Sequence, residues 1–230
     1  MRLDKYLAEA KEGSRSEVKS LISKGFITVN GAVARDPGMK LKEGDDVAVR
    51  GRKVAFREHY YYMMNKPAGF VSATRDEKDK TVLDLFPERL RKDLSPVGRL
   101  DKDSVGLLLI TDDGELAHRL LSPSKHVDKT YLIRTDEPLT VEDVKRFSEG
   151  LVLKDGTELK SAKLELDKED PLCARVTISE GKYHQVKRMT AACGKKVLYL
   201  KRLSMGSLVL DETLGEGEYR ELTEEERLKL

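Results

Sequence analysis

The stretch that decides the fold is residues 96–114, PVGRLDKDSVGLLLITDDG, near the middle of a chain of 230 residues. Its apolar run, Leu107–Ile110, lies between a glycine and the turn-forming residues Thr111–Gly114. This pattern predicts a short buried strand with a turn on each side. Just before the strand, Arg99 and Asp101 stand two positions apart in a loop. The sequence therefore places a guanidinium and a carboxylate together at the edge of a packed strand.

The Arg99–Asp101 pair has a chemical and a structural interpretation. A neighbouring cation favours the ionised form of a carboxylate, and an ionised Asp on a loop beside a packed strand suits a nucleophile or a base. The structural interpretation is a loop salt bridge, which is the ordinary meaning of an isolated Arg-x-Asp pair. These two residues alone leave both interpretations open.

The longer pattern around Asp101 is more specific. Residues 98–107, GRLDKDSVGL, followed by Thr111–Gly114, resemble the catalytic motif of the RsuA/RluA superfamily of RNA pseudouridine synthases. The resemblance implies a central sheet crossed by a cleft, with Asp101 as the catalytic carboxylate. Arg99 is then expected either to fill the space that the target uridine vacates or to grip its phosphate. It implies no cofactor and no metal.

Two further segments fit the same superfamily. Residues 65–69, NKPAG, resemble its first motif, which supports the catalytic loop, so Lys66 is expected to be scaffold. Residues 129–131, KTY, resemble a Lys-x-Tyr motif, which implies that Tyr131 lies against the target base. Taken alone, Tyr131 would be read as a core tyrosine of a strand.

The last motif lies at residues 184–189, HQVKRM. In the superfamily a basic residue here pairs with the catalytic Asp, which implies that Lys187 pairs with Asp101. Many relatives carry Arg at this position, and Arg and Lys are not interchangeable, so Arg188 is the alternative partner. His184 alone is read as a structural histidine.

Charge is spread unevenly along the chain. The net charge is only +2, which by itself does not suggest a nucleic-acid partner. However, residues 178–206 hold seven Lys and Arg against one acid, whereas residues 207–230 hold eight acids against three bases. A polyanion senses a local basic patch rather than the sum over the chain, so the distribution favours binding to nucleic acid.

Cysteine usage and hydropathy indicate the cellular compartment expected for the protein. Cys173 and Cys193 form no CxxC or Cys/His cluster, which argues against a zinc site or a disulfide framework and suits a reducing cytoplasm. No apolar run approaches the length of a membrane span, and no apolar leader is present. We expect a soluble cytoplasmic protein that is a monomer.

The first fifty residues predict two helices followed by a small sheet. An apolar face recurs through residues 3–10, and Ser14 with Glu17 fits a capping box for a second helix that Gly25 ends. Strand-like residues then flank the hairpin dipeptide at positions 30–31, Asn-Gly.

This segment resembles the S4 RNA-binding domain, which implies contact with RNA through the two-helix face. Basic residues on a helix usually form only its solvated surface, so charge alone would not support that role. The residues expected to contact RNA are Arg2, Lys5, Ser14, Arg15, Lys19 and Lys24 in this segment and Arg188 in the second part of the chain.

Residues 50–58 are polar and without periodicity, so we predict a linker there. The expected organisation is an S4 domain over residues 1–57 and a catalytic domain over residues 58–230.

Strands are expected at 60–64, 129–133, 174–178, 198–203 and 208–210, and a hairpin at 151–166. Helices are expected at 114–121, capped by Asp112 or Asp113 and stopped by Pro123, from Thr140 to Phe147, near 187–194, and after Thr223. The fold class is therefore α+β, with a mixed, mostly antiparallel sheet.

The implied reaction turns a uridine in RNA into pseudouridine. The N1–C1′ bond breaks, the uracil rotates and C5 joins C1′, after the nucleotide has left the stack. A carboxylate suits attack at a sugar carbon or stabilisation of its positive charge. Whether Asp101 attacks the sugar, attacks the base or removes a proton stays open.

Two other classes of protein remain possible at this level. One is a non-catalytic RNA-binding or ribosome-assembly protein with the same fold. The other is a metal-dependent hydrolase that uses Asp101 and Asp103 with Asp112 and Asp113. The second requires these carboxylates to cluster, whereas the last two read better as a helix cap.

The expected substrate is ribosomal RNA, free or in a pre-ribosomal particle. Gly98 before Arg99, together with an S4 segment, resembles the RsuA/RluB/RluF branch of the superfamily. The short C-terminal end without a basic tail favours the RsuA type, which acts on small-subunit (16S) rRNA. The alternative is 23S rRNA.

Overall fold

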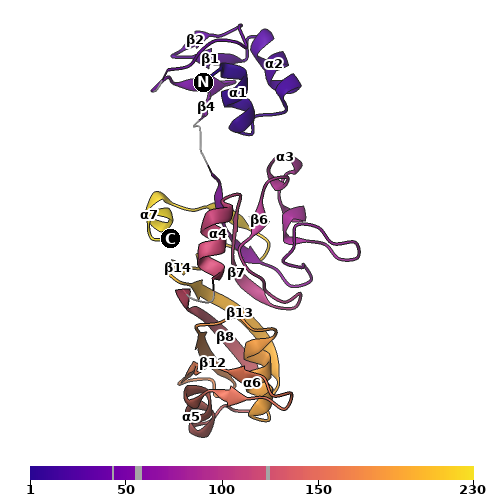
Figure 1. The fold of residues 1–230 in the computed structure, drawn as a ribbon, viewed down its shortest axis with the longest axis vertical. Coiled ribbons are helices and arrows are strands. Elements are labelled where there is room, and N and C mark those ends of the chain that lie inside the picture. The colour runs from indigo at the N-terminus through magenta and orange to yellow at the C-terminus, as the bar shows by residue number, and fades with distance from the viewer. Residues whose placement is uncertain (43, 55–58, 123–124) are drawn as a thin grey trace. The chain divides into compact units, whose positions relative to one another are not determined.

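The computed structural model describes residues 1–42, 44–54, 59–122 and 125–230, which divide into two compact units (Figure 1). The first unit comprises Met1–His59 with Pro87–Lys92, and the second comprises Tyr60–Phe86 with Asp93–Leu230. The expected boundary between residues 57 and 58 lies outside the described residues.

The first unit packs two helices on a small antiparallel sheet. The helices are α1 (Leu3–Glu9) and α2 (Arg15–Ser23), and the sheet has the order β2-β1-β3-β4, with β1 (Ile27–Val29), β2 (Ala32–Val33), β3 (Val47–Val49) and β4 (Arg52–Val54). Ser14 and Glu17 form the capping box of α2. The Asn30-Gly31 dipeptide makes the turn between β1 and β2, both residues having positive φ.

The prediction of a linker starting at Arg50 is wrong. Arg50 and Gly51, with φ of 50° and 78°, form a second tight turn, and Arg52–Val54 returns as β4 beside β3. Only Val54 of this strand is buried, so an edge strand with exposed basic side chains shows no apolar alternation in the sequence. Residues 55–58 of the predicted linker lie outside the described part of the chain.

The second unit is built on a large mixed sheet. Its main path runs β11-β12-β8-β13-β7-β5-β15, and the pair β13–β7 is parallel whereas the other described pairs are antiparallel. The predicted α+β class with a mostly antiparallel sheet is confirmed. The path strands are β5 (Tyr61–Lys66), β7 (Val105–Thr111), β8 (Lys129–Thr135), β11 (Lys163–Leu166), β12 (Cys173–Ile178), β13 (Val197–Met205) and β15 (Tyr219–Glu221).

Shorter elements complete this unit. The strands beside the main path are β6 (Ser95–Pro96), β9 (Leu151–Val152), β10 (Glu158–Leu159) and β14 (Leu208–Val209). The helices are a 3₁₀ turn η1 (Val82–Leu85), α4 (Gly114–Leu121), α5 (Val141–Glu149), α6 (Gln185–Ala192) and α7 (Glu224–Leu228), with α3 (Glu88–Arg91) in the segment grouped with the first unit. Asp113, not Asp112, caps α4, and the expected stop at Pro123 lies outside the described residues.

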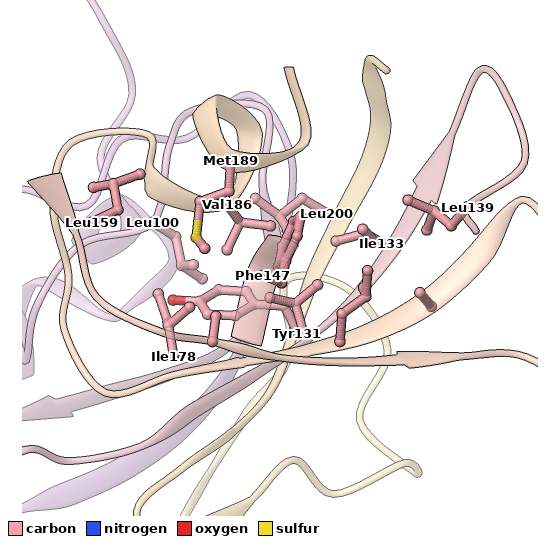
Figure 2. Close-up of a cluster of buried hydrophobic side chains, with 14 residues drawn as sticks. Leu100, Tyr131, Ile133, Leu139, Phe147, Leu159, Ile178, Val186, Met189 and Leu200 are labelled. Carbon is pink, nitrogen blue, oxygen red and sulfur yellow. The ribbon is translucent and has the colours of Figure 1, made fainter. Parts of the chain in front are cut away.

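The sheet is covered by helices over two stretches (Figure 1). Leu116 and Leu120 of α4 pack against Leu107 and Leu109 of β7 in one apolar cluster. A second cluster joins α5 and α6 to strands β8, β12 and β13, and Figure 2 shows Tyr131 within it, near Leu100 and Ile178. Because Leu100 adjoins Asp101, this second core anchors the expected catalytic loop.

The predicted hairpin over residues 151–166 is only partly correct. β9 and β10 pair as expected, whereas β11 pairs with β12 in the large sheet. Alternation of apolar residues identifies a strand but not its partner, and Leu164 is buried beside Val176.

Candidate active site

The loop that carries Asp101 is organised by a buried lysine. Lys66 is 0% exposed, and its Nζ donates to the carbonyl oxygens of Asp101 at 3.1 Å, Ser104 at 2.7 Å and Pro67 at 3.0 Å. Burial lowers the pKa of Lys66 to about 8, against the opposing effect of Asp103 and Asp101. An ammonium group that collects three carbonyl groups sets the path of the loop, which accords with a scaffold role.

A serine holds the same loop on its other side. Ser72 Oγ donates to the carbonyl oxygen of Leu100 and accepts from its backbone N–H, both at 3.0 Å. The N–H and the carbonyl group of Leu100, between Arg99 and Asp101, are therefore both held by Ser72.

Asp101 pairs with Lys187. Lys187 Nζ lies 2.9 Å from Asp101 Oδ2 and 2.6 Å from Asp103 Oδ1, so one ammonium group bridges two carboxylates of the loop. Burial acts to lower the pKa of Lys187, but hydrogen bonds to Asp103 and Asp101 raise it above its ordinary value. The hydrogen bond from Lys187 lowers the pKa of Asp103. Lys187 and Asp103 are therefore both charged around neutral pH.

His184 completes the surroundings of the carboxylate. It precedes α6 in a left-handed conformation with φ of 49°, and its Nε2 lies 3.3 Å from Asp101 Oδ1. Its ring stacks on Tyr183, with centroids 3.8 Å apart. A non-glycine residue in this conformation is uncommon and marks a constrained site. We did not expect this contact, since a lone histidine carries no signal of its partner.

A cavity of 470 Å³ opens beside these groups. Its lining includes Arg99, Asp101, Ser104, Tyr131, His184 and Arg202. Tyr131 is 7% exposed and belongs to the apolar cluster of Figure 2, whereas Arg99 is exposed. A cavity of this size, with an apolar floor and a few charged groups on its wall, has the character of a ligand site.

The lining is set by a row of residues in register across the sheet. Tyr131 of β8 pairs with Arg202 of β13, Arg202 pairs with Gly106 of β7, and Gly106 pairs with Lys66 of β5. Directly opposed residues point to the same side of a sheet, so Tyr131, Arg202 and Lys66 share one face. A Cβ on Gly106 would lie 2.3 Å from the Arg202 carbonyl oxygen, so glycine permits this close pairing.

Three of the expected catalytic residues, Arg99, Asp101 and Tyr131, line this cavity, and Lys187 reaches it through its ion pair with Asp101, whereas Arg188 has another partner. Lys187 is the described partner of Asp101, while Arg188 pairs with Asp155 and lies 3.3 Å from Thr157 Oγ1. His184, Ser104 and Arg202 were not expected in the site, and Asp103 was expected there only in the alternative of a metal-dependent hydrolase. Asp103, Ser104 and His184 lie within the quoted motifs, which is a weak signal, and nothing in the sequence distinguishes the buried Arg202 from its less buried neighbours.

The expected RNA-contact residues of the first unit differ in their surroundings. Arg2 pairs with Asp4 at 2.9 Å, Lys5 with Glu9 at 3.6 Å, and Ser14 accepts the backbone N–H of Glu17. Arg15, Lys19 and Lys24 are exposed and have no ion-pair partner among the described residues.

The carboxylates required by a metal-dependent hydrolase are engaged elsewhere. Asp112 accepts the backbone N–H of Tyr60, and Asp113 caps α4 and accepts the Tyr61 hydroxyl. Over the described ranges, no three His, Cys, Asp or Glu side chains gather as a metal site. In the same part of the chain, no helix has the length and apolar character to span a membrane.

Comparison with known proteins gives two domain matches and several full-length relatives. A family model described as RNA pseudouridylate synthase matches residues 60–192, and the S4 domain model matches residues 1–47. An uncharacterized RNA pseudouridine synthase of Bacillus subtilis is 49% identical over 230 residues, covering 98% of this chain and 96% of that protein. The ribosomal small subunit pseudouridine synthase A of Escherichia coli is 43% identical, covering 98% of each, and that of Vibrio cholerae is 44% identical, covering 98% and 97%. A solved structure described as a pseudouridylate synthase matches with a TM-score of 0.71 and 38% identity, over 100% of this chain and 99% of that one.

Proposed function

This chain belongs to the RNA pseudouridine synthase family and carries an S4 domain, and from that premise we propose that it isomerises one uridine of small-subunit (16S) ribosomal RNA. The observation that carries the choice of RNA is the full-length identity of 44% and 43% to two proteins named ribosomal small subunit pseudouridine synthase A. Position 516 of 16S rRNA is the specific candidate.

We assign the two parts of the chain to recognition and to chemistry. Residues 1–57 would bind RNA through the helix face that carries Arg15 and Lys19, and residues 58–230 would carry out the reaction. The exposure of these two side chains, without ion-pair partners in the described structure, supports the first role.

In the catalytic part, Asp101 is the group that acts on the target nucleotide. Lys187 holds its carboxylate at 2.9 Å, and Tyr131 forms the apolar wall against which the uracil would stack. The exposed guanidinium of Arg99, at the rim of the cavity, is placed to grip the phosphate of the extruded nucleotide or to fill the gap that it leaves. The base is detached and rejoined without addition of water across the glycosidic bond, so a cavity that excludes water suits the reaction better than an open groove.

The experiment is release of tritium from C5-labelled, unmodified ribosomal RNA. We expect the wild type to release tritium from small-subunit RNA and not from large-subunit RNA, and Asp101→Asn to release none from either. Release from large-subunit RNA alone would contradict the proposed substrate. Release by Asp101→Asn at the wild-type rate would contradict the role of Asp101. Tight binding without release from either RNA would favour a non-catalytic RNA-binding protein, or a target that exists only in an assembly intermediate.

A further inference from the structure

Two buried polar groups at the cavity have no hydrogen-bond partner. Among the described residues, the buried side-chain atoms without a partner are Asn65 Oδ1, Ser104 Oγ and Arg202 Nη2. Ser104 and Arg202 are each 1% exposed, and both line the cavity beside Asp101. Folded proteins pair nearly all buried polar groups, so two unpaired donors at one cavity indicate the place of a ligand acceptor.

The position of Arg202 is set by the sheet. Its Nε donates to the Leu107 carbonyl oxygen at 2.7 Å, and its backbone pairs with Tyr131 on one side and Gly106 on the other. Burial, and after it the charge of Arg202, lowers the pKa of Lys129, which also lines the cavity. No ion-pair partner of Arg202 occurs in the part of the chain that the structure describes. The guanidinium is therefore a preorganised positive group in a site that attracts negative charge.

The reaction of the family creates such a charge. When the N1–C1′ bond breaks, its electron pair stays on the uracil, and the resulting anion spreads its charge over the two carbonyl oxygens. The base then rotates, a pair of its electrons forms the C5–C1′ bond, the C5 proton leaves and N1 takes up a proton. No atom is gained or lost, and no co-reactant is needed.

We propose that Arg202 and Ser104 donate hydrogen bonds to the carbonyl oxygens of the detached uracil and stabilise its negative charge during the rearrangement. Both residues would touch the reacting base, so they act as catalytic residues in addition to Asp101. Donors fixed before the reaction need no reorganisation when the charge develops, which is why such groups have large effects on rate. The proposal rests on the pseudouridine synthase activity, and its test must separate the two.

Ser104→Ala is the principal variant because it removes a hydroxyl that has no partner in the described structure. We expect its thermal midpoint to equal or exceed that of the wild type, since an unpaired buried hydroxyl costs stability. Ser72→Ala is the matched comparison: Ser72 is also buried but makes two hydrogen bonds to Leu100, so this change should lower the midpoint. If the thermal midpoint of Ser104→Ala falls as far as that of Ser72→Ala, the hydroxyl of Ser104 makes a hydrogen bond in the folded protein, which contradicts the proposal.

Single-turnover rates at saturating RNA test the chemistry. We expect Ser104→Ala to slow isomerisation about tenfold and Arg202→Met about 100-fold, with RNA affinity changed by less than about threefold. RNA with 5-fluorouridine at the target has no C5 proton to lose, so on it the measured step is cleavage of the N1–C1′ bond with formation of the C5–C1′ bond. Both losses should be smaller for this step, because fluorine at C5 already stabilises the anion of the base. Unchanged rates for Ser104→Ala, or equal losses with both substrates, would overturn the proposal. If Arg202→Met does not fold, Ser104→Ala decides alone.

A binding measurement keeps the inference separate from the choice of RNA. Uridine 5′-monophosphate offers two carbonyl oxygens, whereas cytidine 5′-monophosphate replaces one with an amino group. NMR titration should show that the wild type prefers the uridine nucleotide and that Ser104→Ala and Arg202→Met reduce this preference. If the wild type modifies neither ribosomal RNA, the proposal of ribosomal RNA as the substrate is contradicted. The comparison of the two nucleotides still tests the role of Arg202 and Ser104. Equal binding of both nucleotides by the wild type would refute it.

Discussion

Lys66 shows how one side chain connects burial to the chemistry of the site. Its ammonium group is 0% exposed and collects carbonyl groups of the loop that carries Asp101. Because burial brings its pKa from the ordinary 10.5 down to about 8, the folded protein holds this proton less tightly than the unfolded chain does. The residue therefore links the order of the catalytic loop to pH.

Two opposite trends with pH follow for the wild type. Activity should fall as the pH rises through about 8, since the loop loses its ammonium donor. The contribution of Lys66 to the free energy of unfolding should rise between pH of about 8 and about 10.5, where the unfolded chain still binds the proton. A rate profile and urea unfolding across this range measure both.

Lys66→Arg is the comparison, because a guanidinium stays protonated at these pH values. Its rate profile should lack the inflection near pH 8. The same inflection in this variant would assign the titration to another group.

Lys187 and Arg188 are adjacent cations with different carboxylate partners, Asp101 and Asp155. We expect Lys187→Met to lower the single-turnover rate at saturating RNA about 100-fold or more, because the carboxylate loses the cation that holds it. Arg188→Met should leave this rate within about threefold of wild type and act, if at all, on RNA affinity. The reverse order of effects would make Arg188 the functional partner of Asp101.

At the scale of elements, the parallel pair β7–β13 joins the strand after the Asp101 loop to the strand that carries Arg202. Gly106 has φ of 102°, and a Cβ there would lie 2.3 Å from the Arg202 carbonyl oxygen and 2.7 Å from its nitrogen. Backbone atoms cannot move aside as the end of a flexible side chain can. The close approach of these two strands therefore depends on a glycine at this position.

Gly106→Ala should lower the free energy of unfolding by about 2–4 kcal/mol, because both the clash and the positive φ oppose alanine. Gly114→Ala is the matched control: Gly114 is the first residue of α4, and a Cβ added there would have no atom within 4 Å. We expect the control to stay within about 1 kcal/mol of wild type, since alanine favours helix. Urea unfolding of both proteins measures the difference, and equal values would contradict the packing argument.

At the scale of the whole molecule, we propose that recognition of RNA and chemistry belong to separate units. The exposed Arg15 and Lys19 lie four positions apart on α2, in the unit that does not contain Asp101. Loss of their charge should therefore alter RNA binding without altering the chemical step.

Charge reversal of Arg15 and Lys19 together should weaken binding to ribosomal RNA at least about tenfold. It should also reduce the salt dependence of binding by about one unit of slope for each phosphate that the protein no longer neutralises. The single-turnover rate at saturating RNA should not change. Lys53→Glu is the control, since Lys53 is on β4 of the same unit and already pairs with Asp46 at 3.0 Å. Equal turnover and equal affinity of the double variant on long RNA across a range of salt would refute a role for this helix face.

Local patterns were enough to predict most of the helices and strands. Capping boxes at Ser14, Thr140 and Thr223 mark helix starts because the bonds involved span only three residues. Motif order along the chain likewise pointed to Asp101, Tyr131 and Lys187, which the structure brings to one cavity or ion pair.

What the sequence determined by itself was therefore the family, the class of fold and the chemical character of the central loop, all of which depend on short-range spacing. Only the tertiary structure decided strand partners and partners in space. In the tertiary structure β11 pairs with β12, and Arg52–Val54 forms a strand beside β3. Lys187 pairs with Asp101, whereas Arg188 pairs with Asp155. The tertiary structure also placed Arg202 at the cavity with its Nη2 atom unpaired. The physical reason is that burial, register and hydrogen bonding join residues far apart in the chain, 95 positions for Arg202 and Leu107 and 149 for Asn65 and Leu214, and no local pattern encodes such a pairing.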